Sequence, residues 1–394
     1  MKKSIINFYK AYTGYRNFKK LNSKTRKITF YAEDTQSQNY LLQVLLELLI
    51  NFNEEVCYLT SDPNDSIFEI KNSYKNLNVF YIGDGLIRTW LFASLETDLM
   101  IMTMPDLDTY HIKRSKVYGV HYLYIFHAMV STHSNYRLGA FNSFDTIFCT
   151  GKQQMLEIRK TEEIYGLNKK NLYMDGYRPL DKLINESRSY IKKSGNKKMI
   201  LIAPSWGKNN IFEVCIDKLI DNLLNLDVMI VIRPHPMTIK HEYEQINNLK
   251  EKYFIHENIV FQLDTVNRST LFESDILITD WSGIGMEYGL GLLKPVIYID
   301  TPKKNNNPES KKIDLEPIEI QVRYEIGSVI STNQIENINE LIKNISKSYD
   351  PEAVKKHRKK YVFIKNNSLS KSARRILSIA NSNRSRNIVD SSNN

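Results

Sequence analysis

The sequence predicts an α/β protein built from two doubly wound halves, and three features support this. Short apolar runs rich in β-branched residues alternate with amphipathic stretches from residue 27 onward. The alternation pauses at a polar stretch, residues 192–198, and then restarts in the same rhythm. Several apolar runs end abruptly in polar turns, as parallel strands do when a helix follows. We therefore expect two mostly parallel sheets covered by helices.

The first half, residues 27–190, contains apolar runs of strand length separated by segments with helical spacing. In the segment 39–51, for example, Leu41, Leu45 and Leu48 mark one apolar face. The predicted strands are 27–32, 55–60, 78–82, 99–104, 122–126, 146–149 and 171–174, and the predicted helices are 39–51, 86–95, 151–165 and 180–190.

The second half, residues 191–350, repeats this pattern after the predicted linker. A helical segment at 351–380 follows Pro351, with a break near Asn366, and the tail 381–394 is expected to be disordered. The predicted strands are 199–203, 228–232, 258–262, 276–279 and 296–299, and the predicted helices are 213–226, 239–252, 265–273 and 334–346.

One stretch of the second half, residues 274–300, reads as a βαβ unit with a tight turn. The strand 276–279 stops at Asp280, and we expect Ser282 to cap the following helix, with Glu287 in its early part. A glycine-containing turn at the carboxyl end of a buried strand offers free N–H groups to a phosphate. A tight structural turn without a ligand is the alternative.

The length and composition of the chain indicate a globular protein of two or three domains. The chain has 394 residues, of which 42% are hydrophobic and 25% charged, and these values are ordinary for such a protein. We find no signal peptide and no apolar run of membrane-spanning length. Cys57, Cys149 and Cys215 are scattered, so we expect buried thiols in a cytosolic protein and neither a disulfide framework nor a metal site.

The net charge of +10 is concentrated at the two ends of the chain. Residues 1–27 hold nine Lys and Arg and no acid, and residues 352–394 have a net charge of +9, which leaves −8 for the rest. This pattern argues against a nucleic-acid groove and favours terminal segments that meet an anionic membrane surface. The segment 1–26 also carries interleaved aromatic residues, typical of a helix in a bilayer interface. A solvated helix packed on its own protein is the alternative.

Polar residues follow several predicted strands, where open α/β sheets bind ligands. In the second half these are Ser205, Arg233 with His235, and the run from Thr279 to Gly283; in the first half the residue is His127. Together they suggest a cleft between two Rossmann-like domains. Arg233 offers a forked donor to phosphate oxygens, and His127 can act as a general base.

Purely structural roles are the alternatives. His235 could be a loop histidine whose hydrogen bonds are made within the protein, and His127 could be a core histidine. His121 and His133 are weaker candidates. Asp106 and Asp108 match a D-x-D metal pattern that is common by chance, and we predict no obligatory metal and no cofactor.

Several motifs resemble those of the CDP-glycerol glycerophosphotransferases, the polyol-phosphate transferases of teichoic-acid and capsule synthesis. The sequence departs from the usual family motifs in having Asp-Trp-Ser-Gly at 280–283, where Asp-Tyr-Ser-Ser is frequent, and Phe-His-Ala at 126–128 in place of Trp-His-Gly. The matching pieces are F-H-A-M-V-S at 126–131, F-D-T-I-F-C-T-G at 144–151, G-Y-R-P-L-D at 176–181, A-P-S-W-G at 203–207, R-P-H-P at 233–236, S-D-I-L-I-T-D-W-S-G at 274–283, M-E-Y at 286–288 and K-P-V-I at 294–297.

The resemblance implies a GT-B fold, with the active site between two domains, and a role for each matching residue. His127 corresponds to the catalytic histidine and His235 to the histidine that meets the donor pyrophosphate. Ser282 and Gly283 correspond to the phosphate-holding turn, and Glu287 stands where many members have aspartate.

The implied activity is transfer of glycerol phosphate, or a related polyol phosphate, from a CDP-activated donor to a surface polymer or its lipid-linked primer. The enzyme would work on the inner face of the membrane. The rivals are a nucleotide-sugar glycosyltransferase on the same fold and a non-catalytic binding protein.

Overall fold

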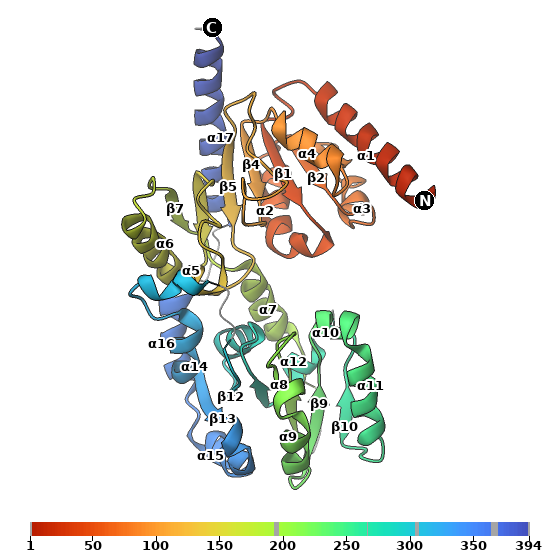
Figure 1. Ribbon diagram of the computed structural model, residues 1–394, viewed down its shortest axis with the longest axis vertical. Coiled ribbons are helices and arrows are strands. Elements are labelled where there is room, and N and C mark those ends of the chain that lie inside the picture. The colour runs from red at the N-terminus through yellow and green to blue at the C-terminus, as the bar shows by residue number, and fades with distance from the viewer. Residues whose placement is uncertain (1, 193–196, 266, 304–306, 364–368, 393–394) are drawn as a thin grey trace. The chain divides into compact units, whose positions relative to one another are not determined.

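The computed structural model describes residues 2–192, 197–265, 267–303, 307–363 and 369–392 (Figure 1). The expected linker and the break near Asn366 fall largely outside these residues. The chain divides into two compact units, each with its own parallel sheet. The first unit comprises residues 1–128, 136–179 and 362–394, and the second unit comprises residues 129–135 and 180–361.

The first unit contains a seven-stranded parallel sheet in the order β3-β2-β1-β4-β5-β6-β7. This is the doubly wound order with one added edge strand, and all seven predicted strands are present. The strands are β1 (Ile28–Ala32), β2 (Val56–Thr60), β3 (Leu77–Tyr81), β4 (Leu99–Met102), β5 (His121–Ile125), β6 (Thr146–Cys149) and β7 (Asn171–Met174).

Helices cover both faces of this sheet, with a separate apolar core under each layer. One core includes residues of α1, α4 and α6; the other includes residues of α2, α3 and α17, and α2 and α17 lie side by side (Figure 1). The helices are α1 (Lys2–Lys20), η1 (Thr35–Ser37), α2 (Gln38–Ile50), α3 (Ile67–Lys71), α4 (Leu86–Ala93), α6 (Lys152–Ile164), α7 (Arg178–Ser189), which continues into the second unit, and α17 (Leu369–Ser392).

The basic N-terminal segment forms the expected helix, and one of its faces packs on the first unit. Ala11 and Phe18 are buried there. A Cβ atom at Gly14 would lie 2.0 Å from the carbonyl oxygen of Tyr81 in β3. The helix therefore needs glycine at this crossing, although glycine weakens an isolated helix.

The second unit contains a six-stranded parallel sheet in the order β10-β9-β8-β11-β12-β13. The register pairs Ile276 with Ile200 across β11 and β8, the position where the strand order reverses. The strands are β8 (Lys198–Ile202), β9 (Val228–Ile232), β10 (Ile259–Phe261), β11 (Ile276–Thr279), β12 (Val296–Asp300) and β13 (Gly327–Ser331).

Two helices predicted as continuous in this unit are each interrupted. Residues 213–226 break at Cys215, whose φ is −157°, and residues 239–252 break at Glu242. The helices are α5 (Thr132–Asn135), α8 (Ile211–Val214), α9 (Ile216–Leu223), α10 (Pro236–His241), α11 (Tyr243–Lys252), α12 (Ser269–Glu273), α13 (Ile284–Met286), η2 (Glu287–Leu292), η3 (Pro308–Lys312), α14 (Ile318–Ile326), η4 (Thr332–Asn337), α15 (Ile338–Ser348) and α16 (Pro351–Tyr361).

The C-terminal segment differs from the expected disordered tail, because α17 continues through residues 381–392. Asn383 is buried and its side-chain amide donates to the carbonyl oxygens of Asp98, at 2.8 Å, and Gly119, at 2.6 Å. These contacts hold the polar end of α17 against the first unit. No helix among the described residues combines the length and apolar character needed to cross a bilayer.

Candidate active site

Three neighbouring strands of the second unit bring most of the predicted phosphate-binding residues to one edge of its sheet. β9, β8 and β11 are adjacent and parallel, so their carboxyl ends lie together. Arg233 and His235 follow β9, Ser205 follows β8, and Ser282 and Gly283 follow β11. The structure therefore groups residues that are as many as 78 positions apart in the sequence.

Asp280 ties two of these loops together. Its side chain is fully buried, and its two oxygens accept hydrogen bonds from the backbone N–H groups of Ser205, at 2.7 Å, and Ile211, at 3.0 Å. The Thr279 hydroxyl donates to the carbonyl oxygen of Ala203 at 2.7 Å. Both side chains are thus engaged with the protein and fix the loop that carries Ser205.

The turn after β11 leaves backbone donors available. The N–H groups of Ser282 and Gly283 have no acceptor among the described residues. The prediction that Ser282 caps the helix is wrong, because Gly283 is the N-cap and no side-chain cap bond is present. A Cβ atom at Gly285 would lie 2.6 Å from the ring of Tyr298, so glycine lets the turn pack closely on β12. The helix then continues in π geometry, which is frequent near functional sites.

His235 and Arg233 present different kinds of donor at this edge. The Nδ1 atom of His235 accepts a hydrogen bond from the N–H of Met237 at 3.1 Å, so in the neutral ring Nε2 carries the proton and is a donor. The Trp206 ring lies 6.3 Å from the His235 ring, nearly parallel to it. Arg233 is half-buried, and one of its nitrogens donates to the carbonyl oxygen of Thr265 at 2.6 Å.

Arg268 is a cation that sequence reasoning missed. Burial lowers the pKa of Arg233, the neighbouring Arg268 lowers it further, and Glu287 and Asp264 oppose this. Arg268 itself pairs with Glu186 at 3.3 Å. Guanidinium groups are donors that suit a pyrophosphate. Arg268 directly precedes α12, after β10, and its place near Arg233 depends on β10 lying beside β9, which the sequence alone does not show.

His127 lies beyond the carboxyl end of β5 in the first unit. Its Nδ1 atom is 2.9 Å from the carbonyl oxygen of Thr103 and 3.0 Å from the hydroxyl of Tyr124. A carbonyl oxygen can only accept, so Nδ1 carries the proton and Nε2 holds the lone pair. The Nε2 atom has no hydrogen-bond partner among the described residues.

Aromatic rings surround His127 and influence its charge state. Tyr40, Tyr124 and Tyr136 meet its ring edge-on, with centroids 6.1, 6.4 and 5.9 Å away. Burial lowers the pKa of His127, and its hydrogen bond to Thr103 only partly opposes this. The imidazole is therefore neutral at neutral pH, as a general base must be.

The weaker candidates have structural partners. His133 is buried in the second unit, where Nδ1 meets the Ser131 hydroxyl at 2.9 Å and Nε2 meets the Leu315 carbonyl oxygen at 3.0 Å. Asp106 pairs with Arg137 at 2.7 Å, and Asp108 accepts the backbone N–H of Arg114 at 2.6 Å. Within the described ranges, no group of three or more His, Cys, Asp or Glu is arranged to hold a metal ion.

His121 lies at the opposite end of strand β5 from His127. It begins β5, whereas His127 follows its other end, and its Nε2 atom meets the Thr146 hydroxyl at 2.8 Å. Burial lowers the pKa of His121, the Asp145 carboxylate opposes this, and Arg114 and Arg386 add to the lowering.

Solved structures with the same fold are similar to this chain at low sequence identity. The wall teichoic acid polymerase TagF matches at TM-score 0.55 and 13% identity, over 96% of this chain and 98% of that chain. A putative UDP-N-acetylglucosamine 2-epimerase from Listeria monocytogenes matches at TM-score 0.57 and 15% identity, over 90% and 95%. Anabaena HepE, in complex with UDP and glucose, matches at TM-score 0.52 and 10% identity, over 90% and 99%. The predicted GT-B fold class is confirmed.

No curated protein matches the chain. The model of one family, described as CDP-Glycerol:Poly(glycerophosphate) glycerophosphotransferase, matches residues 129–379. This segment contains Arg233, His235 and the turn at Ser282, and it begins two residues after His127. Because the match covers well over half of the chain, this protein belongs to the CDP-glycerol:poly(glycerophosphate) glycerophosphotransferase family and is a transferase that uses CDP-glycerol.

Proposed function

We propose that the enzyme transfers glycerol phosphate to a hydroxyl group on a growing surface polymer, such as a teichoic acid or capsule, or on its lipid-linked primer. The match of residues 129–379 to the family model carries this proposal. The polar residues that follow β8, β9 and β11 support it, because they supply donors suited to a pyrophosphate.

His127 is the general base in this proposal. Its neutral ring takes the acceptor hydroxyl proton on Nε2, while Nδ1 keeps its bond to Thr103. The acceptor oxygen then attacks the phosphorus that bears the glycerol. The bond between this phosphorus and the oxygen that links it to CMP breaks, and CMP leaves with the electron pair.

The donor phosphates are assigned to the second unit. Arg233 and the Nε2–H of His235 donate to their oxygens, and the N–H groups of Ser282 and Gly283 add neutral donors. These groups stabilise the negative charge that builds up on the phosphates as CMP departs.

Four further residues contribute more indirectly. Asp280 and Thr279 position the loop of Ser205. We assign Ser205 to the donor site. Glu287 acts on Arg233, whose charge it supports.

We propose that the enzyme lies peripherally on the inner membrane face, and the surface of α1 supports this location. This helix exposes apolar and aromatic side chains beside cations, and α4, which contacts it, exposes Leu86 and Trp90. Such a surface suits an anionic bilayer interface. The exposed residues of α1 include Ile5, Ile6, Phe8, Tyr9, Lys10, Tyr12, Arg16 and Lys20.

A donor screen tests the proposed reaction. Purified enzyme is given CDP-glycerol, CDP-ribitol or UDP-sugars with an acceptor fraction, and release of CMP, UMP or UDP is measured. Release of CMP from CDP-glycerol, dependent on the acceptor, is the expected result. A UDP-sugar glycosyltransferase is the second candidate, because HepE, solved in complex with UDP and glucose, has the same fold. Release of UDP would favour this candidate. A protein that releases no nucleotide with any pair would be a binding protein.

A further inference from the structure

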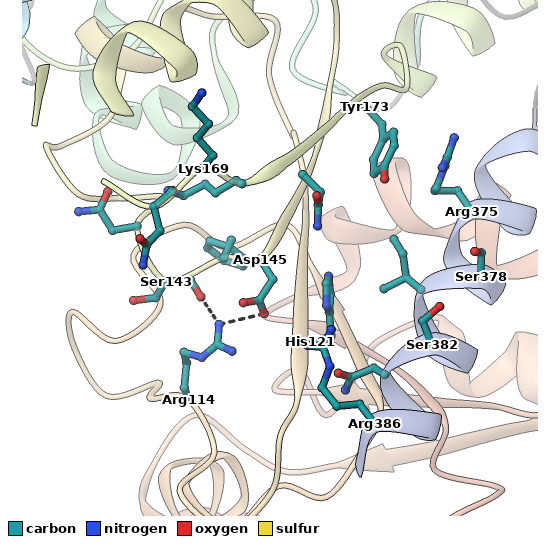
Figure 2. A pocket seen from close by; sticks show the side chains of 17 residues that line it. Arg114, His121, Ser143, Asp145, Lys169, Tyr173, Arg375, Ser378, Ser382 and Arg386 are labelled. Atoms are coloured by element: carbon teal, nitrogen blue, oxygen red, sulfur yellow. Dashed lines mark hydrogen bonds and ion pairs between the residues drawn. The ribbon is translucent and has the colours of Figure 1, made fainter. Parts of the chain in front are cut away.

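A cavity of about 510 Å³ lies in the first unit at the amino ends of β5, β6 and β7, where α17 borders it (Figure 2). His121 and Asn171, the first residues of β5 and β7, both line it. His127 is six residues beyond His121, which corresponds to about 20 Å at 3.3 Å per strand residue. The cavity therefore lies at the amino ends of the strands, and the proposed base lies at their carboxyl ends.

The charge around this cavity is strongly unbalanced. Asp145 is the only carboxylate among the lining residues. It lies 3.0 Å from Arg114, and Lys170 has a partner outside the lining in Glu162, at 3.7 Å. The lining cations are Arg114, Lys169, Lys170, Arg375 and Arg386.

Three of these cations are not neutralised. Within the part of the chain that the structure describes, Lys169, Arg375 and Arg386 form no ion pair with a carboxylate. The Arg375 guanidinium is held over the ring of Tyr173, 4.1 Å from its centroid. Like charges gathered around one cavity repel each other, and a bound anion would relieve that repulsion.

The α17 side of the cavity is mostly polar, although Ile379 also lines it. Arg375, Ser378, Ser382 and Arg386 are spaced by three, four and four residues, so they follow one side of the helix (Figure 2). The side chains offer two guanidinium forks and two hydroxyls, all able to donate hydrogen bonds. Part of the basic C-terminal segment thus faces a cavity in its own protein.

We propose that this cavity binds a phosphate-bearing anion, at a site separate from the one that holds the donor. Forked guanidinium donors match phosphate oxygens, and the volume falls within the usual range for small-molecule sites, about 300–1,000 Å³. The ligand has two possible sources that share this chemistry. One is a free phosphate monoester, and the other is a phosphodiester within a glycerol phosphate polymer. The site itself does not depend on the proposed reaction.

Calorimetric titration of the full-length enzyme at low salt tests the site. The probes are glycerol 3-phosphate and a short poly(glycerol phosphate), and the pocket variant is Lys169→Gln with Arg375→Gln. The matched control is Lys371→Gln with Arg374→Gln, which removes the same charge from exposed positions outside the cavity. We expect the pocket variant to bind at least one probe about tenfold more weakly or worse, and the control to stay within about twofold.

Two further variants distinguish loss of this site from misfolding and from loss of the donor site. Ser382→Glu places a negative charge in the cavity at an exposed helix position, and it should weaken binding even if the double variant folds poorly. Arg233→Ala should lose donor binding but keep probe binding. The proposal is overturned if neither probe binds, if pocket and control variants weaken equally, or if Arg233→Ala abolishes probe binding. Tighter binding of the polymer, beyond its larger number of phosphates, identifies the phosphodiester as the ligand, and otherwise the monoester is assigned.

Discussion

The Nδ1 atom of His127 lies 2.9 Å from the carbonyl oxygen of Thr103, and this contact decides which nitrogen of the ring carries the proton. Since the carbonyl accepts only, the proton is on Nδ1 and the lone pair is on Nε2. His235 has the opposite arrangement, because its Nδ1 accepts the N–H of Met237. One histidine is thus prepared to take a proton and the other to donate a hydrogen bond.

Replacing His127 with alanine should reduce turnover with CDP-glycerol by about 10²- to 10⁴-fold, the usual contribution of a positioned base. Donor binding should remain, because Arg233 and His235 are untouched. Steady-state kinetics, donor titration and thermal melting of the same variant check this. If the variant melts at a lower temperature but retains normal turnover per folded molecule, His127 is a core histidine.

The pH dependence of turnover should identify the same group. A base acts only when neutral, so turnover should fall as pH drops through the pKa of His127. Burial lowers that pKa below its ordinary value of 6.5, and the acid limb should therefore lie below pH 6.5. The free energy of unfolding should depend on pH in the same direction. Because the unfolded chain binds this proton more readily than the folded chain, acid should lower the free energy of unfolding. A pH–rate profile with its acid limb above pH 6.5 would contradict the assignment.

Arg233→Ala and His235→Ala should each weaken donor use by about 10²-fold or more, because each removes a donor aimed at developing phosphate charge. The arginine variant should also reduce the salt dependence of donor binding, since it alone of the two removes a permanent charge. Ser282→Ala serves as the matched milder change, because the N–H groups of the turn remain. Full turnover in both of the first two variants would remove the phosphate assignment.

Asp280→Asn should lower the free energy of unfolding by about 2–3 kcal/mol, the contribution of hydrogen bonds to a charged acceptor. The carboxylate is fully buried and accepts the N–H groups of Ser205 and Ile211, and an amide NH₂ group would face one of them with a second donor. Urea denaturation measures the loss. Glu213→Gln, the same loss of charge at an exposed carboxylate of α8 that accepts the N–H of Asn209, is the control. Equal stability of Asp280→Asn and the wild type would show that the loop needs no such anchor.

The strands could be predicted from the sequence because most are short apolar runs that end in polar turns. Helices were harder where the tertiary structure overrides the local pattern. The segment Ile318–Ile326 alternates apolar and polar residues with the period of a strand, yet it is the helix α14, with Ile318, Val322 and Ile326 buried along one side. Strand β13 follows it with little apolar character, because it lies at the sheet edge.

The candidate site was predicted as a set of strand ends, but not its internal contacts. Polar residues after β8, β9 and β11 could be recognised from the chain alone, since parallel strands end at one edge. The sequence does not show which of these residues point at a ligand, because that depends on pairings between distant residues. Asp280 and Ser205 are 75 positions apart, and their hydrogen bond is visible only once β8 and β11 are adjacent. Arg268 was missed for the same reason.

Membrane binding through α1 is best tested by surface substitutions, since deleting residues 1–26 would also remove the buried Phe18. Phe8→Ser with Tyr9→Ser removes two exposed rings, of which 46% and 65% is accessible to solvent. Lys10→Gln with Lys20→Gln removes two exposed cations, each contributing about 1 kcal/mol near an anionic surface. Both pairs should weaken binding in a vesicle co-sedimentation assay at low salt, because interfacial helices use apolar burial and charge together.

The controls match each change outside α1. Ile50→Ser alters an equally exposed apolar residue of α2, and Lys343→Gln with Lys347→Gln removes two exposed cations of α15. These variants should bind anionic vesicles as the wild type does. The charge variant should lose its deficit at high salt, where screening weakens the wild type too, while the aromatic variant should remain impaired on neutral vesicles. If all four variants sediment with vesicles as well as the wild type, α1 is only a helix packed on its own protein.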